Sequence, residues 1–350
     1  MRARRRCREF DPFTLTRDGD KLRGRGVTDC LGHVALVTQL MCALAACGTR
    51  PRRTVFAVFI ANEENSSKLG VGVDALVAAG ELERLKAGPV FWVDVADKKP
   101  CIGTGGIASW TLRAHGKLFH SGLPHHGINA IELVNAACAE LQRRFYAQWP
   151  AHPQEAVYGF ACGSSMKPTQ MSYPGGSVNQ IPGEATLCGD IRLTPFYELA
   201  AVMRAVEADV ADINANIETA LPTLGPASRF ALPDEGLRGR LSLTWGEGTS
   251  RGLACDLSSP GYAAMRDAFV AVTGECEPMA ITGTLPCIRD LQDAGFDVQT
   301  LGFGLMRTYH ANNEFGLLSD FRDGFRVLAR MIVNMDAQRQ EPASKRARTD

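Results

Sequence analysis

Two kinds of hydrophobic pattern alternate along this chain. The segments 54–61 (TVFAVFIA) and 89–96 (PVFWVDVA) are nearly continuous apolar runs, whereas 33–48 and 72–88 carry apolar residues at intervals of three and four positions. Continuous apolar runs are typical of strands buried on both faces, and the other spacing is typical of helices that cover such a sheet. The first hundred residues therefore predict an α/β domain with a mostly parallel sheet and crossover helices.

The pattern changes between residues 107 and 252, where apolar and polar residues alternate in short runs that end in turn residues. The expected elements follow the order β-α-β-β-α-β, which is that of a small ferredoxin-like α+β unit. They are a strand at 107–116, a helix at 129–147, strands at 167–176 and 184–195, a helix at 197–218 and a strand at 239–248.

After about residue 252 the α/β pattern returns, so the small unit is predicted to be inserted into the larger one. Helical spacing recurs at 261–274 and 320–337, and a continuous apolar run lies between them. We therefore expect a discontinuous larger domain, an inserted α+β domain and a disordered tail. Their predicted boundaries are 1–106 with 253–336, 107–252, and 337–350.

Composition and charge narrow the functions that this fold can serve. The 350 residues are 45% hydrophobic, and 38 Lys and Arg balance 38 Asp and Glu, so no net field favours nucleic acid or a membrane surface. A small polar substrate is favoured instead. Eleven cysteines without a CxxC pair are typical of reduced thiols in a cytoplasm or an organelle matrix. No run of eighteen apolar residues predicts a membrane span, and the basic N-terminus lacks the apolar stretch of a secretory signal.

Charged and ligating side chains follow several of the expected strands. Glu63 and Glu64 come directly after the first apolar run, Asp94 ends the second, and His310 follows the last. Asp29 lies in a glycine-rich loop before a helix. Because ligands gather beyond the carboxyl ends of strands in open α/β sheets, we expect these groups to converge. Several carboxylates with an imidazole suit Zn²⁺ or another divalent ion, with one glutamate binding it and its neighbour moving the proton of a water.

Each of these residues also has an ordinary structural interpretation. A pair of glutamates in a loop is usually surface charge, and Asp29 is also placed to cap the following helix. Asp94 has Lys98 nearby as an ion-pair partner, and His310 is also explained as a loop histidine. Their coincidence at successive strand ends favours the metal site over these separate explanations.

At these residues the chain resembles the co-catalytic metallo-aminoacylase and metallopeptidase family, and within it the plant-type acetylornithine deacetylases. The resemblance covers about residues 10–335 and rests on seven segments in order. They are DPFTLTRDGDKLRGRGVTDCLGHVALVTQLM, VFIANEENSSKLGVGVDALV, FWVDVADKKPCIGTGG, GKLFHSGLPHHGINAIE, NQIPGEATLCGDIRLTPFYE, ITGTLPCIRDLQDAGFDVQTLGFG and TYHANNE.

The resemblance implies a catalytic domain that holds two divalent metal ions, Zn²⁺ or Co²⁺, and an inserted lid or dimerisation domain. It implies hydrolysis of an N-acyl amino acid, here deacetylation of N-acetyl-L-ornithine in arginine biosynthesis. By position, Asp29 bridges the two ions, Glu64 and His310 complete one site, and Asp94 serves the other. Glu63 takes the place of the general base.

The resemblance also implies roles for residues of the lid and its surroundings. The histidine of the HSG motif, His120, stabilises the oxyanion and does so in the active site of the partner subunit, which implies a homodimer. Other positions match residues that bind the substrate, although each is also explained as a salt-bridge or turn residue. These positions are Asn179, Arg192, Gly283, Thr284 and Arg289.

One departure from the family concerns the second metal ion. Family members carry a His-x-Asp motif before the DPF segment, but here DPF begins at Asp11 and the first histidine is His33. We expect either that a segment is missing from this sequence or that the second site is lost. The ligand set is then complete for one ion only. Besides the deacetylase, a deacylase or dipeptidase for another small substrate and an inactive dimeric binding protein remain open.

Overall fold

The computed structural model describes residues 9–338 apart from 49, 66, 67, 69, 223 and 226–229. The chain divides into two compact units. The first comprises residues 1–102, 255–279 and 287–350, and the second comprises residues 103–254 and 280–286. The short segment 280–286, which the sequence placed with the larger domain, clusters with the second unit instead.

The framework of the first unit is formed by β3, β14 and most of β4, which belong to a four-stranded sheet in the order β13-β4-β14-β3. Its strands are β3 (Pro89–Val95), β4 (Lys99–Thr104), β13 (Met279–Ile281) and β14 (Asp297–Gly302). β14 is parallel to β3 and antiparallel to β4, so the sheet is mixed rather than mostly parallel. The reason is local, because Asp97 and Lys98 adopt left-handed backbone conformations that turn the chain back after β3.

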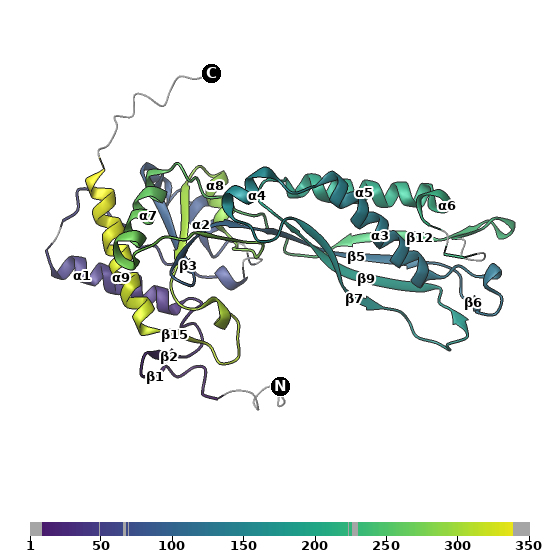
Figure 1. Cartoon of the computed structure of the whole chain (residues 1–350), viewed down its shortest axis with the longest axis horizontal. Coiled ribbons are helices and arrows are strands. Elements are labelled where there is room, and N and C mark those ends of the chain that lie inside the picture. The colour runs from purple at the N-terminus through teal and green to yellow at the C-terminus, as the bar shows by residue number, and fades with distance from the viewer. Residues whose placement is uncertain are drawn as a thin grey trace, which may run out of the picture. The chain divides into compact units, whose positions relative to one another are not determined.

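Three long helices pack together in this unit (Figure 1), and α9 contacts both of the others. They are α1 (Leu31–Ala46), α7 (Pro260–Thr273) and α9 (Leu318–Ala337). The buried positions of α9 recur every three or four residues, as the sequence predicted for an amphipathic helix. Together the helices enclose an apolar core that includes Phe269, Leu301 and Phe303.

Short elements connect these long ones. They are α2 (Val73–Ala78), α8 (Ile288–Asp293) and the 3₁₀ helices η2 (Glu63–Asn65), η3 (Glu83–Ala87) and η6 (Met306–Thr308). The helix expected over 72–88 is divided into α2 and η3, since Gly80 between them takes a left-handed conformation that ends a helix. A small antiparallel sheet of β1 (Thr16–Asp18), β2 (Lys21–Arg23) and β15 (Phe315–Leu317) joins the N-terminal part of the unit to the segment after His310.

Residues 54–61, predicted to be a strand, form no strand in the structure. A strand needs a neighbour that satisfies its backbone groups, and no residue in the described part of the chain pairs with this segment in a sheet. Phe56, Val58 and Phe59 consequently keep 42, 46 and 51% of their surface exposed. The prediction of a strand was wrong here, although the segment still leads directly into Glu63.

The second unit is an antiparallel sheet in the order β12-β5-β9-β7, with two helices lying along one side of it (Figure 1). The strands are β5 (Gly106–His115), β7 (Ser165–Ser172), β9 (Glu184–Leu193) and β12 (Arg240–Trp245), and the helices are α3 (Ala130–Gln148) and α5 (Leu199–Ala215). The chain order confirms the predicted β-α-β-β-α-β unit. Alternate residues of β5 and β9 are buried, including Trp110, Leu112 and Ile191, because one face of the sheet packs on the helices.

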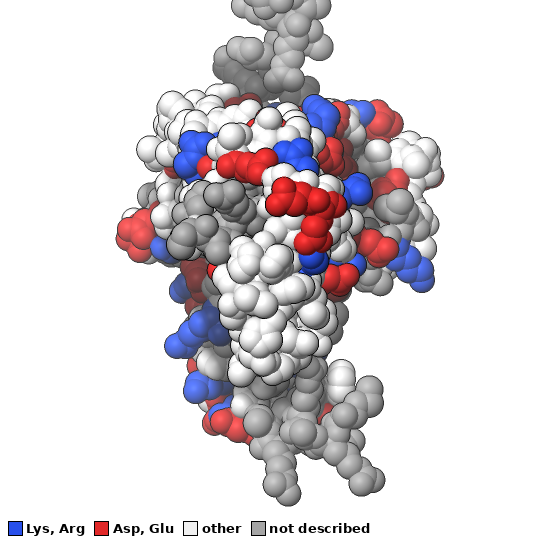
Figure 2. All heavy atoms as spheres, turned by 90° about the vertical axis from the view of Figure 1, so that its right-hand side faces the viewer, with Lys and Arg blue, Asp and Glu red and all other residues white. Residues whose placement is uncertain are grey.

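The remaining elements of the second unit are short. They are β6 (Phe119–His120), β8 (Gln180–Ile181), β10 (Ala231–Leu232), β11 (Leu237–Arg238), α4 (Pro153–Tyr158), α6 (Ile217–Ala220), η4 (Pro124–His126) and η5 (Pro233–Glu235). Figure 2 looks onto the end of this unit that carries β6, where acidic and basic side chains lie side by side around an uncharged surface. That face has no field of a single sign that would suit a nucleic acid. Among the described residues, no helix is both long and apolar enough to cross a membrane.

Candidate metal centre

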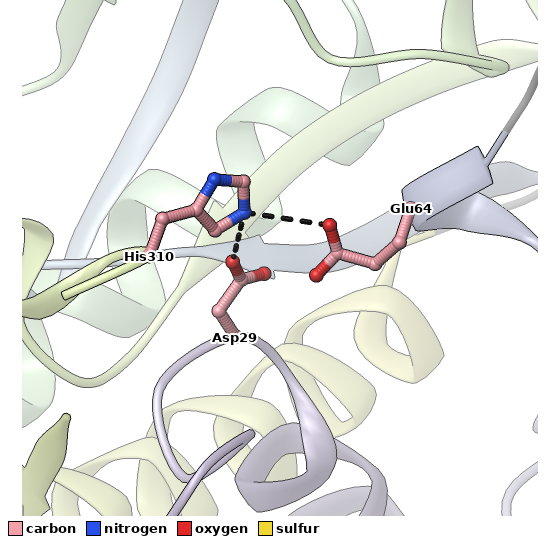
Figure 3. A group of neighbouring side chains, drawn as sticks. All are labelled: Asp29, Glu64 and His310. Atoms are coloured by element: carbon pink, nitrogen blue, oxygen red, sulfur yellow. Dashed lines mark ion pairs between the residues drawn. The ribbon is translucent and has the colours of Figure 1, made fainter. Parts of the chain in front are cut away.

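Three ligating side chains from distant parts of the sequence meet in the first unit (Figure 3). The Nε2 atom of His310 lies 3.0 Å from Oδ2 of Asp29 and 3.4 Å from Oε2 of Glu64. One ligand atom from each residue lies within 4.8 Å of the others. The convergence that the strand ends predicted is therefore present for these three residues.

The backbone around the trio is constrained on both sides. Asp29 lies just before α1, and Gly32 in the first turn of that helix is required, since a Cβ there would lie 2.1 Å from the carbonyl oxygen of Val27. His310 follows η6 with a φ of 50°, a left-handed conformation that a residue other than glycine adopts at a cost of about 1 kcal/mol. Such strain indicates that neighbouring contacts hold the backbone of His310 in this turn, while its side chain is 74% exposed.

Two further carboxylates lie beside the trio, Asp94 buried and Glu63 partly buried. Burial, followed by the charges of Asp94, Glu64 and Asp29, raises the pKa of Glu63 to about 8. Burial also raises the pKa of Asp94 to about 7, and burial and the charge of Glu64 raise the pKa of Asp29. Asp94 is only 7% exposed, and its Oδ1 atom makes no hydrogen bond within the part of the chain that the structure describes. Without a cation, these carboxylates can share this space only by taking up protons.

The donor set fits a divalent metal ion. Two carboxylates and an imidazole within reach of one point are a combination that Zn²⁺ and related ions accept in catalytic sites, where one position is left open. The buried Oδ1 atom of Asp94 supplies another oxygen, one that has no hydrogen-bond partner among the described residues. A cation would satisfy that oxygen and remove the repulsion among the acidic side chains.

Comparison with known proteins decides the family. The sequence profile of peptidase family M20/M25/M40 matches residues 4–334. The chain belongs to this family. It is 58% identical to the acetylornithine deacetylase of Arabidopsis thaliana, in a match covering 94% of this chain and 74% of that protein. The acetylornithine deacetylase of Dictyostelium discoideum is 51% identical, with 92% of this chain and 73% of that protein covered.

Two solved structures share the fold of this chain. Human carnosine dipeptidase 1 superposes with a TM-score of 0.63 at 17% identity, covering 95% of this chain and 76% of that one. An M20 family metallo-carboxypeptidase from Sulfolobus solfataricus superposes with a TM-score of 0.60 at 15% identity, covering 95% and 81%. The predicted fold class of a catalytic α/β domain with an inserted α+β domain is thus confirmed. As a member of the M20 family the chain is a metal-dependent hydrolase, and its family implies a divalent ion.

Sequence reasoning missed three side chains of this M20 site. The Cys30 thiol interacts with the Asp94 carboxylate, and burial among carboxylates raises its pKa. The Tyr309 hydroxyl donates to the carbonyl oxygen of Asp94 at 3.3 Å, and burial raises its pKa as well. Glu314, which is 1% exposed, accepts a hydrogen bond from the backbone N–H of Asp29 at 3.2 Å. The only signal in the sequence was proximity, because each lies within four positions of Asp29 or His310.

The predicted oxyanion residue lies in the second unit. His120 is exposed, and its Nδ1 atom accepts a hydrogen bond from the backbone N–H of Gly122 at 3.0 Å. It pairs with Gln180 across β6 and β8, and the next residue, Ser121, donates its N–H to the carbonyl oxygen of Asn179 at 2.8 Å. Two of the predicted substrate-site residues, His120 and Asn179, are therefore neighbours within this unit.

The two arginines predicted to bind a substrate carboxylate both have local acidic partners. Nε of Arg192 lies 3.1 Å from Oδ2 of Asp190 on β9, and Nε of Arg289 lies 2.9 Å from Oδ1 of Asp293 on α8. Arg192 belongs to the second unit and Arg289 to the first. In the arrangement described, these contacts match the salt-bridge alternative, so substrate binding by either guanidinium remains a prediction.

The remaining predicted substrate residues, Gly283 and Thr284, lie in the segment that clusters with the second unit. The carbonyl oxygen of Gly283 accepts a hydrogen bond from the N–H of Gly105 at 2.8 Å. Both residues are partly buried. The backbone contact fixes the start of this segment, while a role in substrate binding remains a prediction.

The raised carboxyl pKa values predict how the stability of the metal-free protein depends on pH. The pKa of Glu63 rises from 4.5 to about 8 on folding, and that of Asp94 rises from 3.8 to about 7. At pH values between the unfolded and folded pKa of each group, the folded state binds more protons than the unfolded state. The free energy of unfolding is therefore highest below the unfolded pKa values and decreases as the pH rises toward 8. Thermal unfolding of chelator-treated protein should show a midpoint that falls between pH about 5 and 8. A midpoint that rises across this range would contradict the burial of these carboxylates.

Proposed function

We propose that this chain deacetylates N-acetyl-L-ornithine, releasing L-ornithine and acetate, with a divalent metal ion bound by Asp29, Glu64 and His310. The observation that carries the proposal is the convergence of these three ligands beside the partly buried Glu63. The high identity to the Arabidopsis acetylornithine deacetylase supports this choice of substrate.

The metal is Zn²⁺ or Co²⁺, and the described ligands form one complete site. Asp29, Glu64 and His310 provide an oxygen–oxygen–nitrogen set for the first ion. Asp94 and the second oxygen of Asp29 are available for another ion, which they would hold more weakly because they lack an imidazole. When bound, such an ion supplies Lewis acidity that polarises the acetyl carbonyl and lowers the pKa of water.

Glu63 acts as the general base and then as the general acid. Burial and the neighbouring carboxylates raise the pKa of Glu63 to about 8 in the metal-free site, and a cation bound beside it would lower that pKa, which leaves Glu63 as a carboxylate able to accept a proton. Glu63 takes a proton from the attacking water and gives it to the nitrogen of ornithine as the amide bond breaks.

His120 donates to the oxyanion that forms on the acetyl carbonyl, and it does so in the active site of a partner subunit. A homodimer is supported by β7, which lies at the edge of the second unit's sheet with most of its residues exposed. Arg192 and Arg289 are the candidates for binding the substrate carboxylate. Each would release its present acidic partner, Asp190 or Asp293, and pair with the substrate instead. Asn179, Gly283 and Thr284 contribute hydrogen bonds to the substrate.

Subunit mixing tests the role of His120. Glu63→Gln and His120→Ala subunits should each be inactive as homodimers, whereas mixed dimers should recover partial activity. The physical reason is that a mixed dimer contains one site with an intact Glu63 and an intact histidine from the other chain. The measurement is ornithine release after subunits have been exchanged and exchange has been verified with differently tagged chains. No recovery would place His120 in the site of its own chain.

A substrate panel tests the proposed function against its alternatives. N-acetyl-L-ornithine should have a higher kcat/KM than other N-acetyl amino acids and than dipeptides. A higher value for another compound would identify a related amidohydrolase. Binding of N-acetyl-L-ornithine without release of ornithine, at saturating metal, would favour an inactive binding protein.

A further inference from the structure

We propose that Glu314, paired with Arg25, is a positioning residue that holds the carboxylate of Asp29 against the imidazole of His310. This inference deepens the proposed metal site and rests on it. Glu314 lies in the segment between His310 and β15, and Arg25 lies in the loop that leads to Asp29. The pair therefore links the two loops that carry two of the three metal ligands.

The Glu314 carboxylate fixes the Asp29 loop through its backbone. Its Oε1 atom accepts hydrogen bonds from the N–H groups of Thr28 at 2.9 Å and of Asp29 at 3.2 Å. The carbonyl oxygen of Glu314 also accepts from the N–H of Gly24 at 3.2 Å. These contacts bind the chain at and before Asp29, and so they set the direction in which the Asp29 side chain leaves the backbone.

Arg25 completes the link on the His310 side. Its Nη1 atom lies 2.7 Å from Oε2 of Glu314, and its Nη2 atom donates to the carbonyl oxygen of Ala311 at 2.7 Å. Ala311 directly follows His310, whose left-handed backbone needs such support. A planar guanidinium can bond both groups at once, which a lysine ammonium does with less geometric control.

A hydroxyl contact ties the same two loops a second time. The Oγ1 atom of Thr28 donates to the carbonyl oxygen of Phe315 at 3.1 Å and lies 3.3 Å from Oγ1 of Thr308. Thr308 precedes His310 by two residues and also donates to the carbonyl oxygen of Phe315 at 2.9 Å. The link is thus a buried polar network rather than a single ion pair.

The burial of Glu314 separates this network from an ordinary surface salt bridge. With 1% of its surface exposed, its charge is removed from water, and replacing one partner of such a pair is strongly destabilising. Glu64 is exposed, comes from a third segment of the chain and meets these loops through the 3.4 Å contact of its Oε2 atom with Nε2 of His310, so the network organises two ligands and leaves the third to complete the site. Partners that orient metal ligands typically change metal affinity 10–100-fold.

The test is the affinity for Co²⁺, measured by visible absorption, in wild-type protein, Glu314→Gln and a matched control. Glu155→Gln is the control, because Glu155 is also a buried carboxylate, 6% exposed, but lies in the second unit and accepts from Thr194 at 2.7 Å. Glu314→Gln should bind Co²⁺ about 10–100-fold more weakly, since glutamine keeps one acceptor but loses the charge that holds Arg25. Glu155→Gln should lower the thermal midpoint without changing Co²⁺ affinity.

Arg25→Lys provides a second variant in case Glu314→Gln does not fold. The Arg25 side chain is 35% exposed, so this change is tolerated more easily, and the affinity should fall by about tenfold, the lower end of the range for such partners. Unchanged Co²⁺ affinity in folded Glu314→Gln, or in Arg25→Lys if only that variant folds, would overturn the positioning role. Wild-type protein that binds no Co²⁺ would overturn the metal site itself, and these two results are distinguishable.

Discussion

Replacing Glu63 with glutamine lowers kcat for deacetylation by about 10²–10⁴-fold, the contribution expected of a general base, and leaves metal affinity close to that of the wild-type protein. Glutamine keeps the shape of the side chain but cannot accept a proton from water. Glu63 is not one of the three converging ligands, so its loss leaves the set of Asp29, Glu64 and His310 intact. Steady-state kinetics and metal titration of the purified variant measure the two effects separately.

Glu64→Gln is the matched control, because it makes the same substitution at the adjacent residue. Oε2 of Glu64 lies 3.4 Å from Nε2 of His310, so this change should weaken metal binding, and activity should be restored in part by excess metal. Wild-type kcat in Glu63→Gln would remove that residue from the base role. A loss of metal in Glu63→Gln equal to that in Glu64→Gln would show that both carboxylates are ligands.

Replacing His310 with asparagine should weaken metal binding by more than about 100-fold. Even residues that only orient a metal ligand change metal affinity about 10–100-fold when they are replaced, and His310 is a ligand itself. His310 is the only histidine among the converging ligands in the described residues. Asparagine is chosen because it tolerates the left-handed backbone at this position better than alanine does. The side chain of His310 is 74% exposed, so the thermal midpoint of the metal-free protein should change little.

His115→Asn serves as the control for this change, since His115 is a partly exposed histidine at the end of β5 in the second unit. Metal content after dialysis, together with calorimetric titration, compares the two variants. If His310→Asn retained as much metal as His115→Asn, the imidazole would not be a ligand.

Much of this fold follows from local patterns. The β-α-β-β-α-β order of the second unit could be predicted because each element carries its own period, two for β5 and β9 and about 3.6 for α3 and α5. The segment 54–61 could not be predicted in the same way. Its apolar run is suited to a buried strand, but a strand forms only beside a partner, and the run itself contains no information about one.

The residues of the candidate site also differ in whether local sequence patterns could predict them. Asp29 and His310 were predictable because each precedes or follows a recognisable element, and elements of an α/β sheet bring such positions together, whereas Glu64 was placed by an apolar run that forms no strand. Glu314 was not, because its role depends on Arg25, which lies 289 positions away in the sequence. The local partners of Arg192 and Arg289 were visible at two and four positions' distance, and that spacing favours a salt bridge over a free guanidinium.

Ornithine release from N-acetyl-L-ornithine tests the proposed function most directly when metal is removed and then returned. The chain is stripped with a chelator, Zn²⁺ or Co²⁺ is added in steps, and released ornithine and bound metal are measured on the same samples. We predict no release from the stripped chain, and release that rises with metal and saturates as the site of Asp29, Glu64 and His310 fills. Equal release with and without metal, or no release from a chain whose metal site is filled, would contradict a metal-dependent deacetylase.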